Sequence, residues 1–350
     1  MRVRVRGIRR GAHIVVSRAT LDEASNAQSA RSNEVLGERR VALLLLNFSD
    51  RLAPPYSVEV ARQVLGAVAE FFRENSYGRL SLAGDVFGWF TLGMSAAACD
   101  PFRLAEEAHA IVAASGLDLS GYEHLVYVFP QNACPWWGLA TIGGTPAAAW
   151  INGRLTFEIL AHEFGHGLGL SHSRALECGW VALGTACQVL EYGDTLDVMG
   201  MAAGHLSAFH KEQLGWLSEE DASLLPVVAD GTFRLAPYQR VGEGPKALKI
   251  LRSQGAGRAT WYYVEYRVPF GFDRFLSRNP NVPRGVIVRL GSWGEREGSF
   301  LLDMTPETAS WFDPALTVGR TFVDPQTGLT IAVREATEGG AVLVITGIAR

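Results

Sequence analysis

Three histidines and a glutamate stand close together in the segment AHEFGHGLGLSH, residues 161–172. His162 and His166 are four residues apart, so on a helix their imidazoles project from one face, one turn apart. Gly169 lets the chain turn after the helix and brings His172 back as a third ligand. Neutral imidazoles are good zinc ligands, and three of them leave a fourth position open for water, as in catalytic sites. The segment predicts a site for one catalytic Zn²⁺ ion.

Glu163 directly follows the first predicted ligand. A carboxylate at this place can point into the same cleft and act as the base that takes a proton from zinc-bound water. The alternative is an ordinary helix with surface histidines and a glycine at its C-terminal cap. The extended pattern HExxHxxGxxH favours the metal site, because the chain has only eight histidines in 350 residues.

The helix that positions these residues is expected from about 155 to 168. Just before it, residues 136–153 predict two short strands around a Gly-Gly-Thr-Pro turn. A strand at this place often borders an active cleft and can accept an extended peptide as an added antiparallel strand. An ordinary hairpin with no ligand role is the alternative. The residues expected to form the substrate-binding edge are Gly138, Leu139, Ala140 and Thr141.

The rest of the first half predicts alternating strands and helices. Strands are expected at 41–48, about 79–92 and 124–130, and helices at 56–78, about 101–115 and about 205–214. The basic N-terminus predicts a strand, followed by a polar linker at 19–40. From about 226 the residue pattern changes and predicts short alternating strands with Gly and Pro turns. This pattern is typical of a β-sandwich. We therefore divide the chain into an N-terminal strand and linker (1–40), a catalytic domain (41–220) and a C-terminal β-sandwich domain (226–350).

Composition excludes several classes of partner. The net charge is −4, which gives no indication of a nucleic acid or an anionic membrane as the main partner. No apolar run approaches the length of about eighteen residues that a membrane span needs. We expect a monomer that acts on a protein or peptide. The basic N-terminus lacks the apolar region of a secretory signal. We expect an export segment upstream of the given chain; export by another route and a protein that stays inside the cell are the alternatives.

The cysteines indicate the compartment. None has a CxxC spacing or lies near the histidines at a ligand spacing, which argues against a thiolate zinc site. Their even number permits two disulfides in three connectivities, and the local pairing is our prediction: Cys99 with Cys134, and Cys178 with Cys187. This pairing implies an oxidising compartment, whereas four free buried thiols in a cytosolic protein are the alternative.

Several motifs together resemble one family. HExxHxxGxxH followed by a turn methionine is similar to the metzincin clan of zinc endopeptidases, with Met199 in the turn. The chain also resembles the gametolysin family, peptidase family M11, over roughly 40–217. The motifs that carry this resemblance are HEFGH-LGL-H, ENSYG at 74–78, GLATIGG at 138–144, YGD and DVMG between 192 and 200, and HKEQLGW at 210–216.

The resemblance implies an α+β fold. A metzincin-type zinc peptidase domain, with a twisted mixed sheet and an active-site helix, would precede the C-terminal β-sandwich as an accessory domain. In the clan the methionine turn passes beneath the three histidines, which gives Met199 a structural role. Several metzincins carry a tyrosine two residues after this methionine that helps to bind metal or transition state. Met201 occupies that place here, so another donor, or none, takes over the role.

The resemblance also implies the function. Family members act outside the cell on matrix or cell-wall proteins, so we expect a secreted zinc-dependent endopeptidase. The alternative is a non-catalytic zinc-containing adhesion or binding protein, which would need the ligands but not Glu163. A different metallohydrolase that uses the same three ligands is a further alternative. Asp194 and Asp197 could bind Ca²⁺ or cap the turn, and His205 and His210 could take part directly or pack; the sequence leaves the calcium question open.

Overall fold

The apolar run at 41–46 forms the centre of β3 (Gly37–Asn47), the second strand of a five-stranded sheet. Alternate side chains of this run enter buried cores on opposite faces of the sheet, as Leu43 and Leu44 do. A strand covered on both faces needs apolar residues at every position, which explains the uninterrupted run. The computed structural model of the protein describes residues 3–10, 13–21, 34–52, 55–255, 258–293 and 298–348.

The five-stranded sheet is mixed and has the order β4-β3-β5-β7-β6. β3 is parallel to β4 and β5, β5 is parallel to β7, and only β6 runs antiparallel to its neighbour β7. β4 and β6 are the two edge strands. The strands are β4 (Leu80–Thr91), β5 (His124–Phe129), β6 (Gly138–Ala140) and β7 (Ala147–Asn152).

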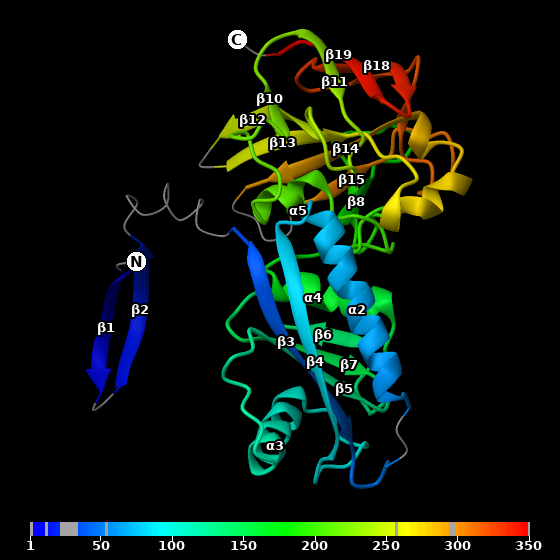
Figure 1. Ribbon diagram of the computed structural model, residues 1–350. Coiled ribbons are helices and arrows are strands. Elements are labelled where there is room, and N and C mark those ends of the chain that lie inside the picture. The colour runs from blue at the N-terminus through cyan, green and yellow to red at the C-terminus, as the bar shows by residue number, and fades with distance from the viewer. Residues whose placement is uncertain are drawn as a thin grey trace.

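Three helices cover the two faces of this sheet. α2 (Val58–Asn75) and α4 (Phe157–Gly167) share one core with the sheet, and α3 (Pro101–Ala114) packs into the core on the other face. Figure 1 shows α2 and α3 on opposite sides of the strands. α2 begins two residues after the predicted start and ends three residues before the predicted end, and the Ser57 side chain caps it by accepting a hydrogen bond from Val60 N.

The N-terminal residues form two strands and not one. β1 (Val3–Arg10) and β2 (His13–Leu21) pair antiparallel, so the first residues of the predicted linker belong to β2. Residues 22–33 of that linker lie outside the described residues. β3 also begins at Gly37 and not at 41, because its polar end is held by an ion pair between Arg39 and Glu123, at 2.5 Å.

The second half of the chain consists mainly of strands, in two sheets. The sheet of eight strands has the order β10-β12-β13-β14-β15-β8-β9, with β16 paired to β14, and the sheet of four has the order β11-β19-β18-β17. The strands are β8 (Arg174–Glu177), β9 (Gln188–Leu190), β10 (Leu224–Val227), β11 (Gly231–Leu235), β12 (Ala247–Gly255), β13 (Arg258–Glu265), β14 (Gly285–Ser292), β15 (Phe300–Leu302), β16 (Leu316–Thr317), β17 (Thr321–Val323), β18 (Thr330–Thr337) and β19 (Gly340–Thr346).

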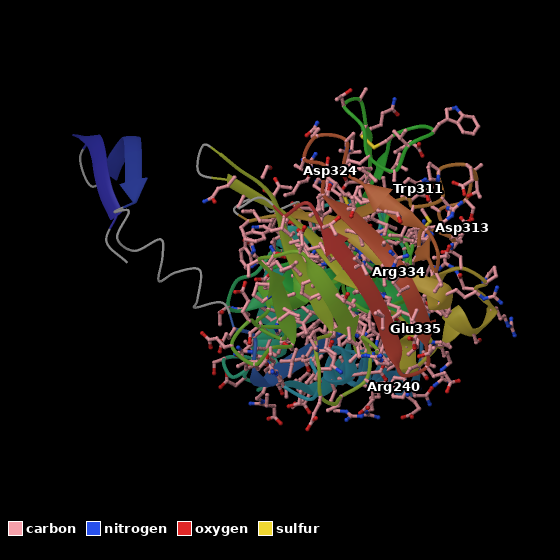
Figure 2. The ribbon with its side chains drawn as sticks, turned by 90° about the horizontal axis from the view of Figure 1, so that it is seen from above. Arg240, Trp311, Asp313, Asp324, Arg334 and Glu335 are labelled. Carbon is pink, nitrogen blue, oxygen red and sulfur yellow. A yellow bond between two sulfur atoms is a disulfide. The ribbon has the colours of Figure 1, made fainter. Side chains whose placement is uncertain are left out.

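The two sheets share one buried core, which includes Val264 and Val288 from the larger sheet and Val333 and Leu343 from the smaller. Figure 2 views the smaller sheet from above, with Arg334 and Glu335 of β18 labelled. Both side chains are exposed although they are neighbours, because the pairing register of β18 and β19 shifts between Val333 and Glu335.

The larger sheet includes strands from both sides of the predicted domain boundary. β15 pairs in parallel with β8, which in turn pairs with β9, and both of these strands precede residue 220. The domain boundary at 220–226 stays a prediction. The pairing of β15 with β8 connects the parts of the chain on its two sides. α5 (Ala208–Gln213) lies at the junction in Figure 1, and η2 (Gly271–Arg278) and η3 (Val282–Arg284) are short 3-10 helices.

None of the helices in the described part of the chain combines the length and the apolar character that a membrane crossing needs.

Candidate metal centre

α4 carries the first two predicted ligands. It begins after Thr156, whose side chain accepts a hydrogen bond from Ile159 N, and it packs its apolar face against the five-stranded sheet. The predicted helix, 155–168, matches the observed one to within two residues at each end. His162 and His166 lie one turn apart with ring centroids separated by 4.8 Å.

The chain turns sharply after α4 and returns with the third histidine. Gly169 has a φ of +100°, a conformation that glycine adopts without strain, and its N–H donates to His166 O at 2.8 Å. His172 then lies with its ring centroid 5.3 Å from that of His162 and 4.9 Å from that of His166. The three ligand atoms lie within 4.8 Å of one another.

Hydrogen bonds fix the orientation of all three imidazoles. His162 Nδ1 lies 2.8 Å from Val198 O, and His166 Nδ1 lies 2.8 Å from Leu170 O. His172 Nδ1 lies 2.6 Å from Glu191 Oε1. Because these oxygens only accept hydrogen bonds, each Nδ1 must carry the proton and donate it. Each Nε2 then keeps its lone pair, which is the arrangement that metal-binding histidines show.

Burial keeps two of these ligands in the form that a metal requires. Burial lowers the pKa of His162, and it lowers the pKa of His166 to about 4. Both imidazoles are therefore neutral at neutral pH. Three imidazoles whose Nδ1 atoms are held by hydrogen bonds fit a divalent ion such as zinc, and a cavity lined by His162 and Glu163 lies beside them.

Glu163 is buried beside the histidines. Its side chain is 7 % exposed and lies against Gly138 of β6, where an added Cβ would overlap the carboxylate. Burial raises the pKa of the Glu163 carboxyl to about 8. A divalent cation next to it would favour the ionised form, which can accept a proton. The same cavity of about 370 Å³ is lined by Glu163, His162 and Gly138.

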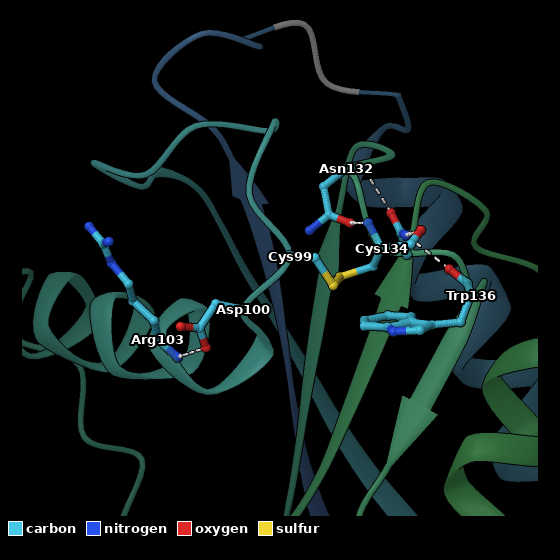
Figure 3. The surroundings of a disulfide bond; sticks show 7 residues. Cys99, Asp100, Arg103, Asn132, Cys134 and Trp136 are labelled. Atoms are coloured by element: carbon cyan, nitrogen blue, oxygen red, sulfur yellow. Dashed lines mark hydrogen bonds between the residues drawn. A yellow bond between two sulfur atoms is a disulfide. The ribbon is translucent and has the colours of Figure 1, made fainter.

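The predicted substrate-binding residues lie at the edge of the sheet. Gly138, Leu139 and Ala140 form β6, whose other side has no neighbour in the sheet, and Thr141 follows. The loop before β6 is held by the Cys99–Cys134 disulfide, with Trp136 nearby (Figure 3). Asn152 also organises this loop, since its side-chain amide donates to Cys134 O and Trp136 O.

Both predicted disulfides are present. Cys99 pairs with Cys134 and Cys178 with Cys187, and the described residues include no free cysteine. The second disulfide closes the loop between β8 and β9. His172 precedes β8 in the sequence, and Glu191 directly follows β9.

Met199 lies beneath α4, where the turn methionine was expected. It is fully buried, and its sulfur lies so close to Gly165 that a Cβ on Gly165 would overlap it. Gly165 precedes the ligand His166, so the absence of a side chain there allows the turn to approach the metal-binding helix.

Asp194 and Asp197 hold the methionine turn. Asp194 Oδ1 accepts from Leu196 N at 2.9 Å, and Asp197 Oδ1 accepts from Met199 N at 2.8 Å. Both aspartates are fully buried, and Asp194 is paired with Arg289. These contacts account for both carboxylates as caps of the turn. None of these contacts of Asp194 and Asp197 indicates a calcium site.

His205 and His210 are buried away from the three predicted ligands. His205 Nε2 lies 2.7 Å from Glu74 Oε1, and His210 Nδ1 lies 3.1 Å from Asp197 Oδ2. Among the described residues, His162, His166 and His172 alone form a group that could hold a metal. His205 and His210 therefore have packing and hydrogen-bonding roles.

Two residues near the metal centre, Glu191 and Tyr192, were not predicted as site residues, because they lie outside the HExxHxxGxxH pattern. Glu191 reaches His172 from nineteen positions later in the chain, and it also accepts from Arg174 Nε at 2.6 Å. Tyr192 lies with its ring centroid 4.1 Å from that of His172. Tyr192 was part of a motif but was not predicted as a site residue. Its positive φ of 58° is unusual for a side chain of this size and marks a constrained position.

Comparisons with known proteins agree with the geometry in part. The family model described as "Gametolysin peptidase M11" matches residues 57–268, which is more than half of the chain. The chain therefore belongs to the gametolysin family, peptidase M11, and so to the class of metalloendopeptidases. No protein in a search of curated sequences matches the chain.

Similarity to solved structures is weak. Metalloproteinase-II from Bacteroides fragilis is 15 % identical with a TM-score of 0.33, over 52 % of this chain and 53 % of that one. OgpA from Akkermansia muciniphila is 13 % identical with a TM-score of 0.32, over 67 % and 74 %. A chain from a chaperone–substrate complex is 16 % identical with a TM-score of 0.29, over 39 % and 27 %. The chain thus spans 27 % and 53 % of the lengths of the chaperone-complex and B. fragilis chains.

Proposed function

We propose that this protein is a secreted zinc-dependent endopeptidase that hydrolyses peptide bonds of extracellular, cell-wall or matrix proteins. The observation that carries the proposal is the convergence of three free Nε2 atoms with the buried carboxylate of Glu163, beside the unpaired edge of β6. Two disulfides support an oxidising compartment. The strand-rich second half would serve as a β-sandwich domain that packs against the catalytic domain.

His162, His166 and His172 would hold the zinc ion. When bound, zinc supplies Lewis acidity that activates water and polarises the scissile carbonyl. Glu163 takes the proton from the attacking water and passes it to the amine that leaves. The backbone of β6 aligns an extended substrate as an additional antiparallel strand.

Tyr192 is the candidate for the donor that the methionine turn lacks. Its ring lies beside His172 and His162, and its hydroxyl has no hydrogen-bond partner among the described residues. Burial and the nearby Glu191 raise the pKa of Tyr192, so its hydroxyl keeps its proton and can donate to the oxygen of the scissile carbonyl as negative charge develops there.

A digestion assay tests the proposed function. The full-length protein, loaded with zinc, should degrade casein or gelatin, lose this activity with a chelator, and regain it when zinc is added back. A protein that binds one zinc per chain but leaves both substrates intact would instead be the non-catalytic binding protein.

A further inference from the structure

We propose that Glu158 makes this peptidase select a lysine or arginine immediately after the scissile bond. The inference rests on the proposed function and adds the substrate class. It follows from the direction in which β6 must bind a substrate and from the chemistry of the cavity next to Glu163.

The geometry of β6 fixes which side of the substrate enters this cavity. A substrate strand that pairs antiparallel to β6 runs from Ala140 toward Gly138. The carboxylate of Glu163 lies against Gly138, so the scissile bond is placed there. The substrate then continues toward Trp137 and Trp136, which line the cavity. The first residue after the scissile bond, called P1′, therefore meets the cavity.

The walls of this cavity are mainly apolar. Its volume is about 370 Å³, which is enough for a long side chain. The residues that line it away from the metal centre are Trp136, Trp137, Ile159, Val198, Met201 and Ala202, together with Glu158. The aliphatic stem of a lysine or arginine can pack on such walls while its charged end reaches a carboxylate.

Glu158 and Glu163 are the only Asp, Glu, Lys or Arg residues among the described residues that line this cavity, and Glu163 is assigned to catalysis. Its carboxylate is exposed and has neither an ion pair nor a hydrogen bond among the described residues. The nearest cation in the sequence, Arg154, lies over the ring of Trp137 at 5.7 Å and is not part of the lining. An unpaired carboxylate at the wall of an apolar cavity favours a cationic side chain and disfavours an anionic one.

A simpler role for Glu158 makes a different prediction. Glu158 lies in the first turn of α4, where a negative charge stabilises a helix through its dipole. If this is its entire role, substitution changes the stability of the helix but not the choice of substrate.

The test uses the full-length zinc-loaded protein and one peptide whose cleavage site has been mapped in casein. Four versions of the peptide differ only at P1′, which is Lys, Gln, Leu or Glu. For the wild type, kcat/KM should be roughly three- to fivefold higher for Lys than for Gln, as expected for an exposed ion pair, and at least about tenfold higher for Lys than for Glu. The preference should shrink in high salt.

Two variants and a control identify the residue. Glu158→Gln should bring the Lys-to-Glu ratio close to one, and Glu158→Lys should reverse it. Glu106→Lys makes the same change of charge at an exposed position of α3, outside the cavity, and should keep the wild-type ratio. Binding of the same peptides to an inactive Glu163→Gln background should follow the same order, which separates recognition from turnover.

The outcomes separate the two proposals. Cleavage of all four peptides at rates within twofold would overturn the role of Glu158 while the peptidase function stands. An unchanged ratio in Glu158→Lys would do the same, and the helix-dipole role would then suffice. A zinc-loaded protein that leaves casein intact, so that no cleavage site can be mapped, would overturn both proposals.

Discussion

His172 differs from the other two histidines of the metal centre in what its Nδ1 contacts. His162 and His166 donate to backbone carbonyls, whereas His172 donates to the carboxylate of Glu191. A charged acceptor raises the basicity of the imidazole and holds the ring in place, which strengthens its bond to a metal. Glu191 is therefore a positioning residue for the third ligand.

Replacing Glu191 should weaken zinc binding. Glu191→Ala should lower the zinc affinity by about 10- to 100-fold, and Glu191→Gln by less, because its amide oxygen still accepts a hydrogen bond. Competition with a chromophoric chelator measures the affinity. Glu335→Ala, at an exposed position of β18, is the control (Figure 2). Equal zinc affinity in Glu191→Ala and the wild type would contradict the role of Glu191.

The hydroxyl of Tyr192 can be tested without disturbing the ring contact with His172. Tyr192→Phe should keep the zinc affinity and KM but lower kcat by roughly 100-fold, since the lost donor acts on charge that develops during the reaction. Steady-state kinetics with a fluorogenic peptide provides the measurement. A kcat within twofold of the wild-type value would show that Tyr192 only packs against the ligand.

At the scale of the element, α4 was the most predictable part of the molecule. Its apolar periodicity, its cap and its glycine stop are local signals, and the predicted and observed bounds agree closely. The three ligands follow from their spacing for the same reason. The pairing of β8 with β15 could not be predicted, because it joins residues more than 120 positions apart and no local pattern specifies such a partner. Glu191 follows β9, nineteen positions after His172, and no ligand-spacing pattern points to it, so it was missed.

The packing of α4 on the sheet also includes a buried titratable group. His124 at the start of β5 is 7 % exposed and stacks on Phe164 of α4 at 4.3 Å between ring centroids. Burial lowers its pKa from 6.5 to about 4. Since the unfolded chain binds the proton more tightly, stability is lost as the pH falls from about 6.5 to about 4.

His124→Phe should remove this loss while it keeps the ring stack. The unfolding free energy of the wild type, relative to that of the variant, should fall by roughly 3 kcal/mol between pH 7 and pH 4, because one pKa unit corresponds to about 1.4 kcal/mol. Denaturant titrations at several pH values measure both curves. Parallel curves would mean that His124 becomes protonated without cost in the folded protein.

At the scale of the whole molecule, the second half of the chain takes part in building the metal centre. Arg289 of β14 is fully buried and donates to both oxygens of Asp194, at 2.7 and 3.1 Å, and also to Glu265. Asp194 in turn accepts from Ser173 Oγ, next to the ligand His172. The strand-rich half thus supports the methionine turn and the third ligand, which goes beyond the accessory role expected from the sequence.

Removal of Arg289 should therefore destabilise the protein. Arg289→Met leaves the buried carboxylate of Asp194 without its cation and leaves Glu265 with Arg267 alone, so it should lower the unfolding free energy by about 3–5 kcal/mol. Arg334→Met, on the outer face of β18 (Figure 2), should change it by less than about 0.5 kcal/mol. Chemical denaturation compares the two. Similar values for both variants would contradict the view that Arg289 connects the halves.

The central claim is that Glu163 is the base of a zinc peptidase, and Glu163→Gln tests it most directly. This variant keeps the size of the side chain and all three histidines, so it should bind zinc near stoichiometrically while peptide hydrolysis falls by about 100- to 10,000-fold. His166→Ala should lose metal and activity together, because it removes a ligand. Metal analysis and hydrolysis of one peptide by both variants give the answer. If Glu163→Gln binds zinc and cleaves the peptide at nearly the wild-type rate, the proposed mechanism is wrong.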